Sequence, residues 1–183
     1  MPLPPRRWYW PAFSHHLIVI LRRYTQHRLL APLVGLIALL LGITVVVPFT
    51  PVLMAVIVMV PGQRVALWLW SAVGTAIGMW ITAAAVHWYG PSLVDTYFPG
   101  TIGNAQWLSY QGWMTQWGEG ALFLMGSTPL PQLPMLVMAG LSDLSLWSIA
   151  LTLLGSKLVK YAMITGATSF LSQLARRPWR RKS

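Results

Sequence analysis

Residues Gly118 to Tyr161 read GEGALFLMGSTPLPQLPMLVMAGLSDLSLWSIALTLLGSKLVKY. Three prolines, Pro129, Pro131 and Pro134, stand inside its uncharged run from Gly120 to Ser142. Because proline lacks the helical N–H and its ring clashes with the preceding turn, the prolines break any helix there. In a bilayer the freed carbonyls must be satisfied by protein or by water in a cavity. The run therefore predicts a re-entrant hairpin that turns at the prolines and leaves on the side it entered, as broken helices at transport sites do.

The composition is that of an integral membrane protein. The 183 residues are 56% hydrophobic and 9% charged, with a mean hydropathy of +0.59, whereas about 25% of a soluble domain is charged. The length fits one domain with about three to four transmembrane helices. The chain has no cysteine, which excludes disulfides and thiolate sites. Its few, scattered carboxylates give no catalytic constellation. We therefore predict no enzyme, no cofactor and no metal site.

Positive charge gathers at the two ends of the chain, in residues 1–28 and 175–183. Thirteen Lys and Arg residues oppose three Asp and Glu residues. The basic residues flank apolar segments and do not alternate with aromatics as in a nucleic-acid-binding protein. This pattern indicates positive-inside orientation and attraction to anionic headgroups. The predicted partners are membrane lipids, anionic ones in particular, and no nucleic acid. Whether the chain forms a homo-oligomer stays open.

Residues 1–28 are expected to form a basic, aromatic segment in the cytoplasm or at the membrane interface, and residues 175–183 a basic tail. The membrane domain is expected over residues 29–174. Its expected parts are spans over 29–47, 65–89 and 144–174, proline-broken hairpins over 48–62 and 120–142, and an interfacial amphipathic helix over 101–118. Three spans and two hairpins would place the basic ends on opposite sides. If the second proline segment crossed completely, four spans would bring both ends inside.

Small residues recur at helical spacing in the first two expected spans. Gly35 and Gly42 lie in one, and Ser71, Gly74, Thr75 and Gly78 lie in the other. Such stripes allow close helix packing. In residues 101–118, Trp107, Tyr110, Trp113 and Trp117 recur at spacings of three and four and predict an aromatic stripe on a helix that lies flat on the membrane.

A weak internal repeat relates the two proline segments. Thr50-Pro51 is followed eleven residues later by Gly62, and Thr128-Pro129 is followed eleven residues later by Gly140, at an offset of 78 residues. Proline-interrupted segments at corresponding positions of two halves point to a transporter's binding site. We therefore expect an all-α membrane protein with two re-entrant hairpins in a weak inverted repeat.

Lys157 and Lys160 stand near the middle of the last expected span, three residues apart and thus on one face. A lysine at the centre of a bilayer costs at least ~2.5 kcal/mol, so it should face a water-filled cavity or an anionic partner. The alternative is that both side chains extend to a membrane interface.

Four motifs resemble the DedA/VTT (SNARE-associated) superfamily, in particular its YqaA-like branch. They are Val47-Pro48-Phe49-Thr50-Pro51, Gly74-x3-Gly78 running to Tyr89-Gly90, Met138-Ala139-Gly140, and Gly155-Ser156-Lys157-x2-Lys160-Tyr161. The resemblance implies two hairpins that meet at mid-membrane in a bacterial inner membrane. It also implies movement of phospholipids or polyprenyl phosphates across the bilayer, coupled to protons in some members.

The chain departs from that family at both hairpins. Where the family carries an acidic residue after its first proline, this chain has Val52 and Leu53, and where it carries Arg or Asp after the second, this chain has Gln132, Leu133 and Pro134. Ion coupling would then depend on Glu119. That carboxylate could equally be a helix-start residue stabilised by the helix dipole.

The expected function is movement of phosphate-bearing lipids, by a flippase-like or scramblase-like route. We expect Arg64, Lys157 and Lys160 to bind the lipid phosphate. The expected groove consists of Pro48, Thr50, Pro51, Ser127, Thr128, Pro129, Pro131, Gln132 and Pro134. The alternative is a non-catalytic membrane scaffold or assembly protein, in which the hairpins form a packed, dry interface.

Overall fold

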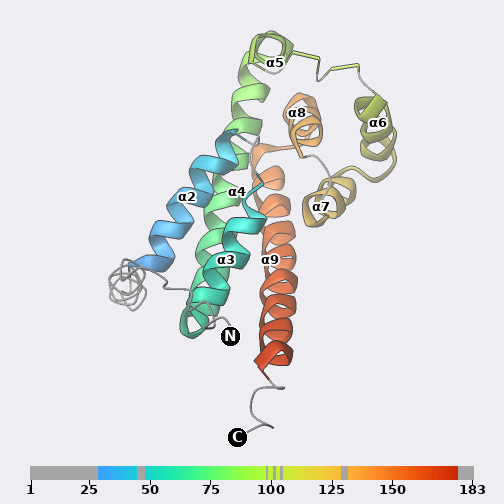
Figure 1. Ribbon diagram of the computed structural model, residues 1–183. Coiled ribbons are helices and arrows are strands. Elements are labelled where there is room, and N and C mark those ends of the chain that lie inside the picture. The colour runs from blue at the N-terminus through green and yellow to red at the C-terminus, as the bar shows by residue number, and fades with distance from the viewer. Residues whose placement is uncertain are drawn as a thin grey trace, which may run out of the picture.

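The computed structural model describes residues 29–44, 48–97, 99–100, 102–103, 105–128 and 132–176. Within these ranges every regular element is a helix (Figure 1). The expected N-terminal segment and residues 177–183 of the expected tail lie outside them. The helices are α2 Leu30–Thr44, α3 Thr50–Met59, the short 3-10 helix η1 Pro61–Gln63, α4 Arg64–Tyr89, α5 Pro91–Tyr97, α6 Ala105–Trp117, α7 Glu119–Ser127, α8 Leu133–Leu141 and α9 Leu146–Arg176.

Two helices are long and apolar enough to cross a membrane, over Pro61–Tyr89 and Leu146–Ser172. They coincide with the expected spans over 65–89 and 144–174. The first expected span contains only the 15-residue α2, which at 1.5 Å per residue is shorter than the ~30 Å of a hydrocarbon core.

α2 and α4 pack backbone against backbone at the predicted small residues. A Cβ atom added to Gly35 would lie 2.8 Å from the carbonyl oxygen of Trp70, and one added to Gly42 would lie 2.9 Å from that of Thr75. Further along, Thr82 Oγ1 donates a hydrogen bond of 2.8 Å to the carbonyl oxygen of Ile43. Residue numbers rise together along this contact, so α2 and α4 are parallel.

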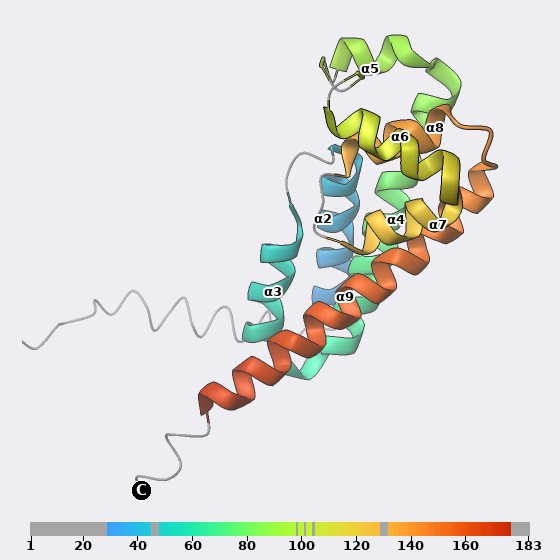
Figure 2. The same ribbon diagram turned by 90° about the vertical axis from the view of Figure 1, so that its right-hand side faces the viewer.

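α9 lies antiparallel to α4 (Figure 2). Trp68 Nε1 donates to the carbonyl oxygen of Leu158 and Trp80 Nε1 to that of Leu146, both at 2.9 Å. Later residues of α4 thus meet earlier residues of α9. It follows that α2 and α4 begin at the end of the molecule where α9 finishes.

The first proline segment differs from the expectation. Because α2 and α4 are parallel, the connecting α3 must run back between their opposite ends, as Figure 1 shows. α2 and α3 are therefore the two arms of one broken hairpin, whereas we expected a complete span followed by a separate hairpin over residues 48–62. The apolar run from Leu29 to Gln63 has no charged residue. Pro48 marks the break, but no charge shows whether the chain has crossed the membrane there or reverses.

The second proline segment is a hairpin that enters and leaves at the same end of the molecule. α7 runs alongside α9. At the start of α7, Ser148 Oγ donates to Glu119 Oε1, and at the end of α7, Lys160 Nζ donates to the carbonyl oxygen of Thr128. α8 then returns, and the carbonyl oxygen of Gly140 lies 3.0 Å from His87 Nδ1 near the end of α4.

Aligning the two proline segments by the starts of their helices pairs other residues than the sequence repeat does. Pro51 and Pro134 both stand in the first turn of a short helix, α3 and α8. These two prolines are 83 residues apart, whereas the sequence repeat has an offset of 78 residues. Thr128, the predicted equivalent of Thr50, does not start a helix but caps the end of α7. Proline at a helix start removes an N–H that has no helical partner, which explains why both helices tolerate it.

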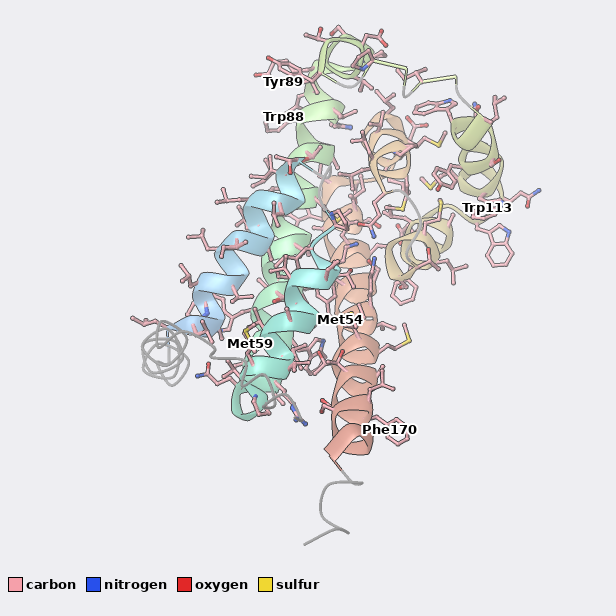
Figure 3. All side chains as sticks on the ribbon, in the orientation of Figure 1. Met54, Met59, Trp88, Tyr89, Trp113 and Phe170 are labelled. Carbon is pink, nitrogen blue, oxygen red and sulfur yellow. The ribbon has the colours of Figure 1, made fainter. Side chains whose placement is uncertain are left out.

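The expected aromatic stripe of α6 divides between two faces. Tyr110 is buried and Trp107 is half-buried against α4, α7 and α8, while Trp113 and Trp117 are exposed. The two steps of three residues turn Trp113 about 120° away from Trp107, which takes it off the buried face. Trp117 returns to within about 20° of Tyr110, but it is the last residue of α6 and stays exposed. Figure 3 shows Trp113 pointing away from the other helices.

Candidate functional site

Both broken segments contact the same stretch of α9. A Cβ atom added to Gly126, near the end of α7, would lie 2.5 Å from Ser156 Oγ. From the first segment, the ring of Phe49 meets the ring of Tyr161 edge to face, with centroids 6.0 Å apart. The stretch from Gly155 to Tyr161, predicted as a basic, aromatic cluster, is thus the meeting point of the two proline breaks.

Lys157 is enclosed by the second break. Its side chain is 1% exposed, and its Nζ atom donates to Gln132 Oε1 at 2.7 Å and to the carbonyl oxygen of Gly126 at 3.2 Å. One turn later, Lys160 Nζ donates to the carbonyl oxygen of Thr128 at 2.9 Å. The ammonium groups thus bind the final carbonyls of α7, where a helix dipole is negative. They satisfy acceptors that the proline break leaves open.

These partners differ from the cavity or anion that we expected. Every hydrogen bond of the two lysines with described residues goes to a carbonyl or amide oxygen, and none goes to a carboxylate. Lys160 is only half-buried, and one of its three ammonium donors is used within the described chain. It is therefore the cation of this pair that an incoming anion could reach.

A seam of polar side chains continues from the lysines between α4 and α9. Tyr161 and Thr75 share a hydrogen bond of 3.1 Å between their hydroxyls. Ser71, one turn before Thr75, is fully buried, and its hydroxyl has no hydrogen-bond partner among the described residues. From the sequence, Ser71 and Thr75 were predicted only to pack against a neighbouring helix. The spacing of four between Lys157 and Tyr161, which places them on one helix face, was the signal that could have joined them.

The remaining expected groove residues are distributed as follows. Ser127 Oγ and Thr128 Oγ1 donate to carbonyls of their own helix, those of Phe123 and Met125. Such local bonds leave the two hydroxyls without a free proton for a ligand. In the first segment, Pro48 and Pro51 are exposed and Thr50 begins α3, whereas Pro134 is buried in α8. Pro129 and Pro131 lie outside the described residues.

Arg64 and Glu119 stand apart from the lysines. Arg64 begins α4 at the end where α9 finishes. Within the described part of the chain, its buried Nε atom has no hydrogen-bond partner, and no hydrogen bond joins Arg64 to either lysine. Glu119 is exposed in the first turn of α7 and accepts from Ser148. That position favours the helix-start interpretation of its carboxylate.

No family model, curated protein or solved structure matches this chain. Among the described residues, no three His, Asp or Glu side chains gather that could hold a metal ion. The chemistry of the site is therefore that of two ammonium groups at a broken helix, beside a tyrosine and a seam of hydroxyls.

Proposed function

We propose that this chain is an integral membrane protein of the DedA/VTT type, in a bacterial inner membrane, that moves phosphate-bearing lipids across the bilayer. One observation carries the proposal: the two proline breaks meet on α9 beside two lysines that have no carboxylate partner in the described chain. An ammonium group binds phosphate as a point charge. Broken helices back to back are the usual setting of a transporter's binding site.

The surface of α9 supports a membrane location. Only 28% of its most apolar 18-residue window is buried, whereas a core helix of a soluble protein would be mostly covered. Leu151, Met163 and Phe170 are exposed on this helix, and Figure 3 shows Phe170 pointing away from the bundle. An extended apolar surface of this kind fits contact with lipid tails.

The helix directions support an inverted repeat. α2, α3 and α4 form one set of two hairpin arms and a long helix, and α7, α8 and α9 form a second set that runs in the opposite sense. In a bilayer, one hairpin would enter from each side, and the start of α3 and the end of α7 would both lie near the level of Lys157 to Tyr161. This is the arrangement that inverted-repeat transporters use.

Charge placement predicts the orientation. α2 begins and α9 finishes at one end of the molecule, next to the basic segments of the sequence, while Asp95, Glu119 and Asp143 all belong to the other end. By the positive-inside rule, both termini should be cytoplasmic. Green fluorescent protein fused to either terminus should fluoresce, and alkaline phosphatase should be active only when inserted at Gly100, between α5 and α6. Phosphatase activity at either terminus would contradict this topology.

In the proposed mechanism the two lysines have different tasks. Lys157 is buried, and its hydrogen bonds to Gln132 and Gly126 stabilise the turn of the second hairpin. Lys160 would bind the phosphate as the headgroup passes between the hairpins, while the acyl chains stay in the bilayer. Since a scramblase needs only a polar path and a cation for the phosphate, the absence of acidic residues from both breaks is compatible with this route.

Lys160→Met is expected to slow headgroup exchange of a fluorescent phospholipid in proteoliposomes about tenfold, because a charge-assisted contact worth ~1.4 kcal/mol is lost. Lys160→Arg should retain most of the rate, since the charge remains. The thermal stability of each variant must be measured in parallel. A folded Lys160→Met protein that exchanges lipid as fast as wild type would remove Lys160 from the mechanism.

The enclosure of Lys157 favours a second candidate, a membrane scaffold without a transport path. Its ammonium donates two hydrogen bonds inside the protein, and α7 touches α9 directly at Gly126 and Ser156. A scaffold would exchange lipid no faster than protein-free liposomes do. Exchange by the wild-type protein well above that background would exclude a purely structural role.

A further inference from the structure

An open groove of about 400 Å³ lies between α6 and the end of α8, at the acidic end of the molecule. One wall is a single face of α6, which contributes Trp107, Gln111 and Met114. The opposite wall consists of Met138 and Leu141 of α8 and of Asp143 in the turn to α9. In Figure 1 the two helices stand side by side above α7.

The groove combines apolar walls with one negative charge. Neither Lys, Arg nor His lines it. Asp143 is exposed and forms no hydrogen bond or ion pair with a described residue. The hydroxyls of Thr115 and Ser142, which also line the groove, donate to nearby backbone carbonyls. A carboxylate on an aromatic and aliphatic surface is complementary to an organic cation, since ammonium groups bind both carboxylates and indole faces.

The groove is placed where lipid headgroups would be. Its lining residue Leu144 shortly precedes the start of α9 at Leu146, and Gly140, the neighbour of its lining residue Leu141, lies 3.0 Å from His87 near the end of α4. Those are the ends of the two helices that are long enough to cross a membrane. Exposed aromatic side chains surround this end of the protein: Trp88, Tyr89, Tyr97, Trp113, Trp117 and Trp147. Such rings settle at the level of the headgroups.

We propose that this groove binds the ammonium group of an amine-bearing phospholipid, with Asp143 pairing with the charge and the apolar walls covering the adjoining carbon chain. This proposal rests on the proposed function, in which the protein binds phospholipids, and it adds the class of headgroup. The groove is separate from the lysines. Eleven residues of helix, about 16 Å, separate Leu146 from Lys157, so one headgroup cannot occupy both places at once.

The test is calorimetric titration of the purified full-length protein, in a neutral maltoside detergent, with dihexanoyl-phosphatidylethanolamine. Dihexanoyl-phosphatidylglycerol has the same chains and phosphate but lacks the amine. We expect saturable binding of the ethanolamine lipid and at least tenfold weaker binding of the glycerol lipid. Asp143→Asn keeps the shape of the side chain and removes its charge, so it should weaken binding of the ethanolamine lipid about tenfold.

Asp95→Asn is the matched control, because it removes the same charge from an exposed site at the same end of the molecule but outside the groove. It should leave binding unchanged. Leu141→Trp, which fills the groove from its half-exposed wall, should abolish binding. Equal binding of the two lipids, no saturable binding, or equal weakening by Asp95→Asn and Asp143→Asn would each overturn the proposal. Lipid exchange in liposomes is a separate measurement, so binding without exchange would count against the proposed function alone.

Discussion

Gly74→Leu and Gly78→Leu are expected to destabilise the protein more than any other substitution considered for it. A Cβ atom at Gly74 would overlap the backbone of Gly35, and one at Gly78 would overlap the backbone of Leu39. Backbone cannot move aside as the end of a flexible side chain can, so α2 and α4 must separate along their whole contact. Overpacking in a core typically costs 1–3 kcal/mol, and we expect each substitution to cost about 3 kcal/mol or more. Thermal unfolding in detergent would measure the loss.

Gly166→Leu is the matched control for both. Gly166 lies in α9, and a Cβ atom there meets nothing within 4 Å. Because leucine is the better helix former by up to ~1 kcal/mol, this variant should be as stable as wild type or slightly more so. If Gly74→Leu unfolded at the same temperature as Gly166→Leu, the close approach of α2 and α4 would be wrong.

Lys157→Met should give the second large effect, a loss of about 2 kcal/mol of unfolding free energy. Methionine fills similar space, but it leaves the carbonyl oxygen of Gly126 and the amide oxygen of Gln132 without their donor. A buried acceptor without a partner costs ~1–3 kcal/mol. Removing a buried charge also relieves a desolvation cost, which opposes the loss. Two acceptors depend on this one ammonium, so we expect the loss of hydrogen bonds to prevail.

Lys160→Met is the comparison for Lys157→Met, and it should cost less. Lys160 is half-buried and serves one acceptor, so water can replace its ammonium at Thr128. A Lys157→Met protein as stable as wild type would mean that desolvation outweighs the hydrogen bonds of Lys157. The lysine would then be retained for its charge, and its structural role at the turn of the hairpin would be refuted.

Several features of this site were predictable because they depend on single residues. Proline lacks an N–H, so the breaks near Pro48 and Pro129 could be located from the sequence. The spacing of three between Lys157 and Lys160 put both on one face of a long helix. Their partners could not be predicted, since Gln132 and the end of α7 are distant along the chain and reach the lysines only after the second hairpin has folded back onto α9.

The sequence by itself determined that the protein is built of apolar helices, where those helices are interrupted, and which small residues allow two of them to touch. Those properties follow from covalent structure, from charge content and from helical spacing. Only the tertiary structure decided that α3 is the returning arm of a hairpin begun by α2, and that Pro51 and Pro134 each stand in the first turn of a short helix. It also decided that Lys157 caps a helix end instead of facing a cavity. The physical reason is that an uncharged apolar run can reverse at several points with similar local energy, so its path is selected by the surfaces against which it packs.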